Sequence, residues 1–315
     1  MSQSFRSKMI SALAAGFVMT ALPVFGQGVP VEGPLPTTAT ISVQSKSGAP
    51  LDPALLKLQV NGQDTPILSV KPIPPPGAQI AILIDDGLRS GFGNQLDDFA
   101  TFINSLPPGA KVLVGYMQNG TVRGMNTFTA NHQAAAAQLR IPMSVAGVNG
   151  SPYFTLSEFA KHWPSNQPGA RFVLLVTNGV DPYNGRPSVM NQNSPYVQTA
   201  QEDAQRAGVA VYSIYYPQSG MRGGRGSFSG QSYLAQVGEA SGGTSFNMGT
   251  ITPPSLSPYL NEFSKAIAGS YLVRFNVSSA RVKRDTLIRI KLKTTQPGVK
   301  IQTPNNVHPG VDLMW

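Results

Sequence analysis

The sequence contains no cysteine, and only 12% of its 315 residues are charged. The absence of cysteine excludes disulfide frameworks, thiolate zinc sites and cysteine nucleophiles. Its three histidines lie in separate segments, and it has no His-Glu-x-x-His, Gly-x-Ser-x-Gly, P-loop or Gly-x-Gly-x-x-Gly motif after a strand. We therefore expect no enzymatic activity. A hydrolase that uses Ser90 or Ser151 with a distant base is the remaining catalytic alternative.

Long apolar runs are also scarce, and the exception is at the N-terminus. Arg6 and Lys8 precede the apolar stretch Met9–Phe25, and a small-residue cleavage site ends at Gly26. This order is typical of a cleaved secretory signal peptide over residues 1–26. The alternative is a signal anchor that stays in the membrane. We expect a secreted or periplasmic protein of the bacterial envelope, with no transmembrane segment after cleavage.

The remaining chain divides into four parts by its composition and its apolar patterns. Residues 27–37 are rich in Pro and Gly, so we expect a tether. Residues 38–77 carry short alternating strands, with a turn at Asn61-Gly62, before a Pro-rich connector. Residues 78–269 alternate apolar strands with helical patterns, which indicates an α/β domain with a doubly wound, mostly parallel sheet. Residues 270–315 return to alternating strands, and we expect them to pack with 38–77 as a flanking β-sandwich element.

Within the α/β part, the apolar periodicity predicts individual elements. Strands are expected over residues 79–85, 111–117, 121–129, 171–177, 208–214 and 244–247. Helices are expected over residues 96–103, 132–139, 197–207, 233–240 and 256–268, whereas the Gly-rich residues 219–230 are expected to form a surface loop. Within the runs 79–85 and 171–177, residues 80–84 and 172–176 are all apolar, as in central strands covered on both faces.

Polar loops follow these central strands. Residues 85–90 come after the first strand, residues 178–194 after the second apolar strand, and residues 148–153 precede a helix between them. Ligands of open α/β sheets bind outside the carboxyl ends of the strands. The three loops are therefore a candidate site on topological grounds alone.

The chain resembles the von Willebrand factor A (vWA) domain family, and more narrowly the secreted vWFA-related proteins of Acidobacteria. The resemblance rests on the order of several motifs: the strand ending in Asp85, Phe128-Thr129, the run Val209–Ile214, the run Ala240–Phe246 and the run Ser270–Phe275. It covers roughly residues 38–310. It implies a Rossmann-like domain that binds protein ligands through a metal-ion-dependent adhesion site.

The residues that the resemblance assigns to that site depart from the family pattern of Asp-x-Ser-x-Ser, Thr and Asp. Asp85 matches the first Asp, but Gly87 and Arg89 replace the serines. Ser151 replaces the Thr, and Asn178 replaces the last Asp. A permanent cation in the same loop opposes binding of Mg²⁺, Mn²⁺ or Ca²⁺. We expect no cofactor. If an ion binds, its ligands are Asp85, Ser151 and Asn178.

Two interpretations of Arg89 remain open: it pairs with Asp85 in place of the ion, or it points to solvent. Asp86 and Asp181 are potential replacement carboxylates or ligand contacts. The loop after the second apolar strand is rich in Asn, Pro and Tyr, and loops of this kind carry recognition on rigid scaffolds. Its expected ligand contacts are Tyr183, Asn184 and Arg186.

The basic excess is concentrated at the C-terminal end. Residues 270–315 contain eight Lys or Arg and two Asp, within a chain of net charge +9. Arg289, Lys291 and Lys293 alternate with apolar residues, which predicts a strand with one basic face. That face is either a surface for acidic polymers or a solvated face that discourages edge pairing.

The function expected from the sequence is non-enzymatic binding of a protein or cell-surface ligand, with no nucleic acid partner. It would use an adhesion-type vWA module whose metal site is degenerate. The alternative is a structural or scaffolding envelope protein that works through its basic C-terminal β surface. The sequence leaves the partner and the oligomeric state open.

Overall fold

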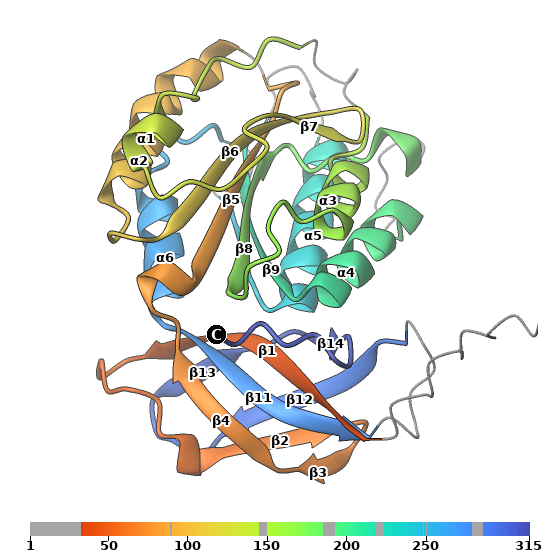
Figure 1. Cartoon of the computed structure of the whole chain (residues 1–315). Coiled ribbons are helices and arrows are strands. Elements are labelled where there is room, and N and C mark those ends of the chain that lie inside the picture. The colour runs from red at the N-terminus through yellow and green to blue at the C-terminus, as the bar shows by residue number, and fades with distance from the viewer. Residues whose placement is uncertain are drawn as a thin grey trace, which may run out of the picture. The chain divides into compact units, whose positions relative to one another are not determined.

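The computed structural model describes residues 33–88, 90–144, 150–184, 193–217, 224–247, 249, 251–278 and 286–315. The predicted signal peptide lies outside these residues, and so do Arg89 and Arg186. Figure 1 shows the arrangement of the helices and strands. In the described part of the chain, no helix combines the length and the apolarity needed to cross a membrane.

The α/β part is built on a six-stranded sheet of order β10-β9-β8-β5-β6-β7. Neighbouring strands are parallel except for β7, which pairs antiparallel with β6 at one edge. The strands are β5 (Ala78–Asp85), β6 (Lys111–Gln118), β7 (Thr121–Gly124), β8 (Ala170–Thr177), β9 (Val209–Tyr215) and β10 (Ser245–Phe246). The predicted α/β class with a mostly parallel sheet is confirmed.

Helices cover both faces of this sheet. They are α1 (Leu96–Ser105), α2 (His132–Ala136), α3 (Pro152–Lys161), α4 (Pro195–Ala207), α5 (Gly224–Ser241) and α6 (Ser257–Ala268). On β5, Ile80 and Ile82 belong to the core cluster that contains Phe99 of α1 and Phe263 of α6. The alternate side chain Leu83 belongs to the cluster of α3, α4 and α5. Both faces of β5 are therefore buried, which explains why its residues 80–84 are all apolar.

Strands from the two ends of the chain form two further sheets, each of four strands. One has the order β13-β1-β11-β4 and the other β14-β12-β2-β3. The strands are β1 (Pro34–Ser45), β2 (Leu56–Val60), β3 (Gln63–Thr65), β4 (Ile67–Pro72), β11 (Ser270–Ser278), β12 (Ile288–Thr294), β13 (Val299–Gln302) and β14 (Asn306–Val307). Side chains of both sheets share one apolar cluster, which includes Ile41, Leu58, Phe275 and Ile290.

The turn expected at Asn61-Gly62 joins β2 to β3. Asn61 has a φ of 49° and Gly62 a φ of 81°, and Val60 pairs with Gln63. Two positive φ values in a two-residue loop match the twist of a tight hairpin, which is why Asn-Gly is favoured there.

Two predicted loops are partly regular structure. The tether expected over residues 27–37 overlaps β1, which begins at Pro34. Prolines fit there because β13 pairs only with Ser42–Ser45, so this stretch of β1 is an edge on that side. The Gly-rich loop expected over residues 219–230 overlaps α5, which begins at Gly224. Within the overlap, glycine is required at Gly230, because a Cβ there would lie 2.2 Å from the Asn178 carbonyl oxygen.

Candidate functional site

The candidate site lies where the strand order of the six-stranded sheet reverses. After β5 the chain builds β6 on one side, and it later returns to build β8 on the other side of β5. Asp85 ends β5 and Thr177 ends β8, and the preceding residues Ile84 and Val176 are register partners. Open α/β sheets bind ligands at such a switch point.

The two carboxylate oxygens of Asp85 hold the adjacent loops together. Oδ1 accepts a hydrogen bond from the backbone N–H of Gly87 at 2.9 Å. Oδ2 accepts one from the Thr177 hydroxyl at 2.7 Å, and Thr177 Oγ1 accepts in turn from the N–H of Gly179 at 3.2 Å. Asp85 therefore connects the ends of the two central strands through a buried threonine.

Asp86 is fully buried and faces different partners from those of Asp85. It forms an ion pair with Arg140 at 2.6 Å, and it also accepts hydrogen bonds from Gln118 and from the N–H of Met143. Burial by itself raises the pKa of Asp86. The hydrogen bonds from Arg140, Gln118 and Met143 and the charge of Arg140 outweigh burial, so the pKa is lowered from its ordinary value. Asp86 is thus a structural anion and is not exposed to a ligand.

Arg140, the partner of Asp86, is a residue of this sheet edge that the sequence did not indicate. Its guanidinium lies 3.8 Å from the ring centroid of Tyr116, and its carbonyl oxygen accepts a hydrogen bond from the Tyr116 hydroxyl at 2.7 Å. Burial raises the pKa of Tyr116. The sequence gave no signal for this cluster, because Arg140 follows Asp86 by 54 positions and lies beyond the short helix α2.

Ser151 and Asn178 complete the positions that the family resemblance assigns. Ser151 is fully buried at the N-terminus of α3, and its hydroxyl has no hydrogen-bond partner among the described residues. Asn178 Oδ1 accepts from the N–H of Val180 at 2.9 Å, within its own turn. A buried hydroxyl without a partner costs free energy, so Ser151 is an uncompensated polar group of this edge.

These residues do not fit a divalent ion of the family's kind. Asp85 uses both oxygens within the protein, and Asn178 offers a neutral amide oxygen that is already an acceptor. Mg²⁺ prefers one or two carboxylates among closely spaced oxygen ligands. Across the described residues, no group of three or more His, Asp or Glu is arranged to hold a metal ion.

The loop after β8 is pinned by Asp181 and Asn184. Asp181 is buried, and its carboxylate accepts from the N–H of Tyr183 at 3.1 Å and from the Ser194 hydroxyl. The amide nitrogen of Asn184 donates to the carbonyl of Asn193 at 3.2 Å and to the Tyr233 hydroxyl at 2.9 Å. These two residues bring the ends of the loop together, so the structure places them in supporting positions.

Tyr183 is exposed, and it belongs to a group of three aromatic side chains that we name the aromatic patch: Phe154 of α3, Tyr183 and Tyr196 of α4. Their exposed fractions are 37%, 56% and 37%. The ring centroids of Tyr183 and Tyr196 are 5.4 Å apart, and those of Phe154 and Tyr196 are 6.2 Å apart. Of these three residues, the sequence pattern indicated only Tyr183. Phe154 directly follows the loop 148–153, but nothing in the sequence shows that the three rings meet.

Two glycines allow the rings of the aromatic patch to lie close to the backbone at the sheet edge. A Cβ on Gly120, in the turn between β6 and β7, would lie 2.3 Å from the Phe154 ring. A Cβ on Gly150 would lie 2.8 Å from the Tyr183 hydroxyl. Both glycines have a positive φ, so a side chain there is disfavoured by backbone conformation as well as by contact.

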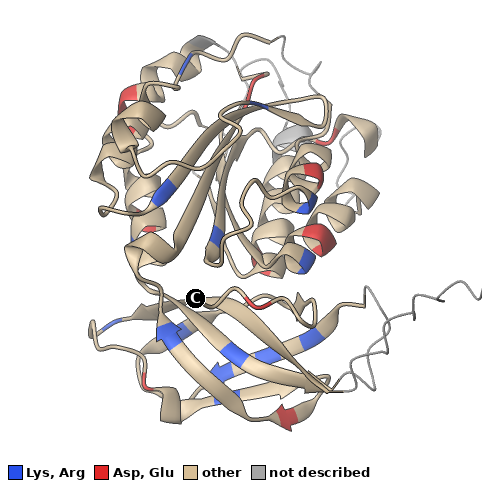
Figure 2. Cartoon of the chain, viewed as in Figure 1, with Lys and Arg blue, Asp and Glu red and all other residues tan. Residues whose placement is uncertain are grey.

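The predicted basic strand is β12. Arg289, Lys291 and Lys293 are exposed, whereas Ile288, Ile290 and Leu292 face the apolar cluster. Lys293 pairs across the sheet with Lys57 of β2. Figure 2 shows Lys and Arg at several positions along the strands of these two sheets. We name Lys57, Arg289, Lys291 and Lys293 the basic face. None of the four forms an ion pair with a described residue.

Comparison with known proteins finds similarity only at the level of the fold. No family model and no curated protein matches the chain. A von Willebrand factor type A structure from Catenulispora acidiphila is 11% identical, with a TM-score of 0.44, over 88% of this chain and 74% of that one. BatB from Bacteroides thetaiotaomicron is 11% identical, with a TM-score of 0.41, over 61% of this chain and 98% of that one.

The pilus adhesin SpaC from Lactobacillus rhamnosus GG is also similar, at 11% identity and a TM-score of 0.47. The match covers 81% of this chain and 48% of SpaC, so the chain spans about half the length of that adhesin. Similarity at this distance carries no functional inference. The α/β class of this chain rests on its own strand order.

Proposed function

We propose that the protein is a secreted, non-enzymatic vWA-type module, of the kind found in Acidobacteria, that binds a protein or cell-surface partner at the carboxyl edge of its six-stranded sheet. The strand order supports this location because the edge lies at a topological switch point. The aromatic patch supplies the contact surface, and three carboxylates, the half-buried Asp85 and the buried Asp86 and Asp181, hold the loops that carry it.

The observation that carries the proposal is the exposure of three packed aromatic rings at this one edge. Tyr and Phe are enriched at protein interfaces, where a few such side chains dominate the binding free energy. Phe154 and Tyr183 are held against Gly120 and Gly150, and Tyr196 packs against both rings. A surface that is ordered before binding loses less conformational entropy on association.

We propose that binding at this edge needs no divalent ion, so that the adhesion site of the vWA family is degenerate here. Support comes from Asp85, whose oxygens are used by Gly87 and Thr177, and from Asn178, which replaces a carboxylate. Neutral aromatic contact takes the place of metal-bridged contact in this proposal.

Export through the segment 1–26 is part of the same proposal. Its support is the order of cations, apolar residues and small residues at the N-terminus. Mass spectrometry of the protein purified from the envelope of its host would give Gln27 as the first residue. A first residue upstream of the apolar stretch would favour the signal-anchor alternative.

The proposed surface can be tested by selecting peptides from a phage-displayed random library on the immobilised protein, once in EDTA and once in millimolar Mg²⁺. We expect peptides that bind equally in both buffers. Their affinity should fall about tenfold or more when the protein carries Tyr183→Ala or Phe154→Ala. Phe228→Ala is the matched control, since Phe228 is 53% exposed on α5, outside the aromatic patch. Binding that requires Mg²⁺, or that survives both patch variants, would contradict the proposal.

The basic face supports a second candidate, a scaffolding role through an anionic envelope polymer. This candidate is supported by three cations of β12, which are exposed and have no acidic partner among the described residues: Arg289, Lys291 and Lys293. Binding of this kind weakens steeply with salt, whereas aromatic contact does not. Salt dependence of envelope binding therefore distinguishes the two candidates.

A further inference from the structure

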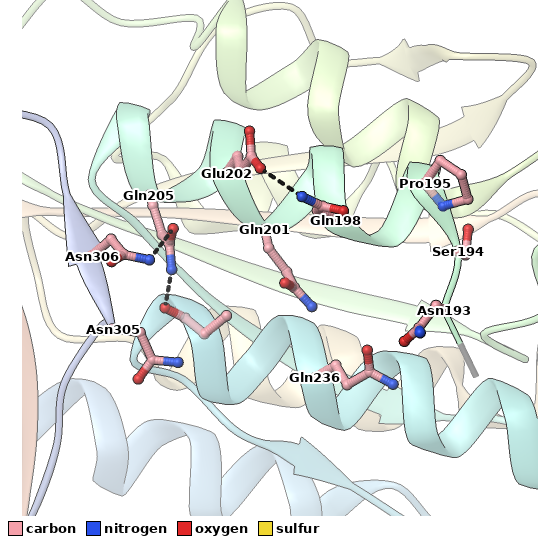
Figure 3. A pocket seen from close by; sticks show the side chains of 11 residues that line it. Asn193, Ser194, Pro195, Gln198, Gln201, Glu202, Gln205, Gln236, Asn305 and Asn306 are labelled. Atoms are coloured by element: carbon pink, nitrogen blue, oxygen red, sulfur yellow. Dashed lines mark hydrogen bonds between the residues drawn. The ribbon is translucent and has the colours of Figure 1, made fainter. Parts of the chain in front are cut away.

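A polar pocket lies along α4 and α5, apart from the aromatic patch. Its cavity volume is about 600 Å³, within the range of roughly 300–1,000 Å³ that is usual for ligand sites. Figure 3 shows α4 on one side, α5 on the other, and the segment around β14 closing one end. Three separate parts of the chain thus contribute to one pocket.

The lining of this pocket has an unusual composition. Seven of its eleven lining residues are Asn or Gln, and none is Lys, Arg, His or aromatic. Glu202 is the one charged lining residue, and its carboxylate is engaged by Gln198 at 3.0 Å and Arg206 at 3.1 Å. A lining without a cation does not select phosphate or carboxylate ligands, and one without aromatic or large aliphatic side chains does not select apolar ones.

Hydrogen bonds of the buried Gln205 connect the elements at the base of the pocket. Gln205 is 4% exposed, and its amide nitrogen donates to the Ala240 carbonyl at 2.7 Å. Its amide oxygen accepts from Asn306 at 3.2 Å, so one hydrogen-bond chain joins α4, α5 and β14. This arrangement fixes the positions of the groups above it.

Other amides of the lining keep their hydrogen-bonding capacity for a ligand. The side chains of Asn193, Gln201 and Asn305 make no hydrogen bond within the part of the chain that the structure describes. Gln201 extends from α4 into the space between the two helices in Figure 3. Each amide offers two donors and an acceptor, so the three together present a dense set of neutral donors and acceptors.

We propose that this pocket binds a neutral saccharide. A sugar ring carries a hydroxyl on most of its carbons, and each hydroxyl both donates and accepts, which matches a wall of amides. An extended peptide offers its N–H and C=O groups only along its edges, and its side chains need space on both faces. The pocket gives no apolar recess for such side chains, so the saccharide is the better match.

Saturation-transfer difference NMR with the full-length protein tests the proposal directly. The probes are neutral trisaccharides built from glucose, galactose, mannose or N-acetylglucosamine, with triglycine as the comparison ligand. We expect transfer to at least one trisaccharide, with a dissociation constant on the order of 1 mM because aromatic stacking is absent. Gln201→Ala and Asn305→Ala should each weaken binding about tenfold.

Gln133→Ala is the matched control, because Gln133 is an exposed glutamine on helix α2 and does not line the pocket. It should leave saccharide binding unchanged. The proposal is overturned if no trisaccharide receives saturation, or if Gln201→Ala binds as well as the unaltered chain. Transfer to triglycine alone, abolished by Gln201→Ala, would assign the pocket to peptides instead. Loss of peptide binding at the aromatic patch would leave this result unaffected.

Discussion

The carboxyl edge of the six-stranded sheet and the basic face of β12 use charge in opposite ways. At the sheet edge, Asp86 and Asp181 are buried and bonded to neighbouring segments. On β12, Arg289, Lys291 and Lys293 are exposed and have no acidic partner among the described residues. The difference shows that charge fixes the architecture at one surface and stays exposed to solvent at the other.

The largest effect that tests this contrast is expected from removal of the Arg140 charge. Arg140→Gln leaves the buried Asp86 carboxylate without its cation, and breaking a buried pair from one side costs about 3–5 kcal/mol. Because Arg140 is 31% exposed, we expect the lower value, about 3 kcal/mol, and a fall in melting temperature of about 6–12 °C. Calorimetric thermal unfolding measures the change.

Lys265→Gln is the control for this prediction, because Lys265 forms a solvent-exposed ion pair with Glu262. Solvent-exposed ion pairs contribute about 0–1 kcal/mol to the free energy of unfolding. Equal losses in the two variants would show that Asp86 does not depend on its partner, and the contrast between the two surfaces would fail.

A second effect concerns acid stability. Burial raises the pKa values of Asp86 and Asp98, but hydrogen bonds from their partners lower both below the ordinary 3.8. Below 3.8 the unfolded chain therefore binds more protons than the folded chain, so stability is complete above that pH and falls as pH drops through the folded pKa. The slope is at most about 1.4 kcal/mol per pH unit for each carboxyl.

Urea unfolding between about pH 6 and pH 2.5 measures this loss. Asp98 accepts from Ser255, Leu256 and Ser257 and so connects α1 to the start of α6. Asp98→Asn should be less stable at pH 6 and lose less stability on acidification. A variant whose stability falls as steeply as that of the unaltered chain would exclude Asp98 as a source of the slope.

The sequence predicted the central architecture well because the apolar runs of β5 and β8 and the helical periodicity of α1 are local signals. It also predicted that Asp85 and Asn178 lie at one edge of the sheet, since the parallel strands β5 and β8 end there. It did not predict the partners of Asp86, because Arg140 is brought to it by folding. The aromatic patch was missed for the same reason: Phe154 and Tyr196 lie on separate helices.

A smaller effect on stability is expected from removing either of two hydroxyl groups at the same sheet edge, and the two should differ. The Thr177 hydroxyl donates to Asp85 and accepts from Gly179, whereas the buried Ser151 hydroxyl has no partner among the described residues. Thr177→Val should lower the free energy of unfolding by about 1–2 kcal/mol. Ser151→Ala should leave it unchanged or raise it by up to about 1 kcal/mol, since an uncompensated group is removed. Urea unfolding of both variants measures the difference, and a loss in Ser151→Ala equal to that in Thr177→Val would reveal a partner for Ser151.

The smallest effect belongs to the basic face, where Lys57 and Lys293 are directly opposed across β2 and β12. Opposed like charges on a sheet destabilise it, and replacing one by its opposite should add about 0.2–1 kcal/mol. Lys293→Glu should therefore raise the melting temperature at low salt, and the gain should shrink at high salt because the pair is exposed. Lys300→Glu is the control, since Lys300 faces Gln44. If both substitutions stabilise equally, the gain comes from the reduced net charge of the whole chain, and the opposition of Lys57 and Lys293 has no local cost.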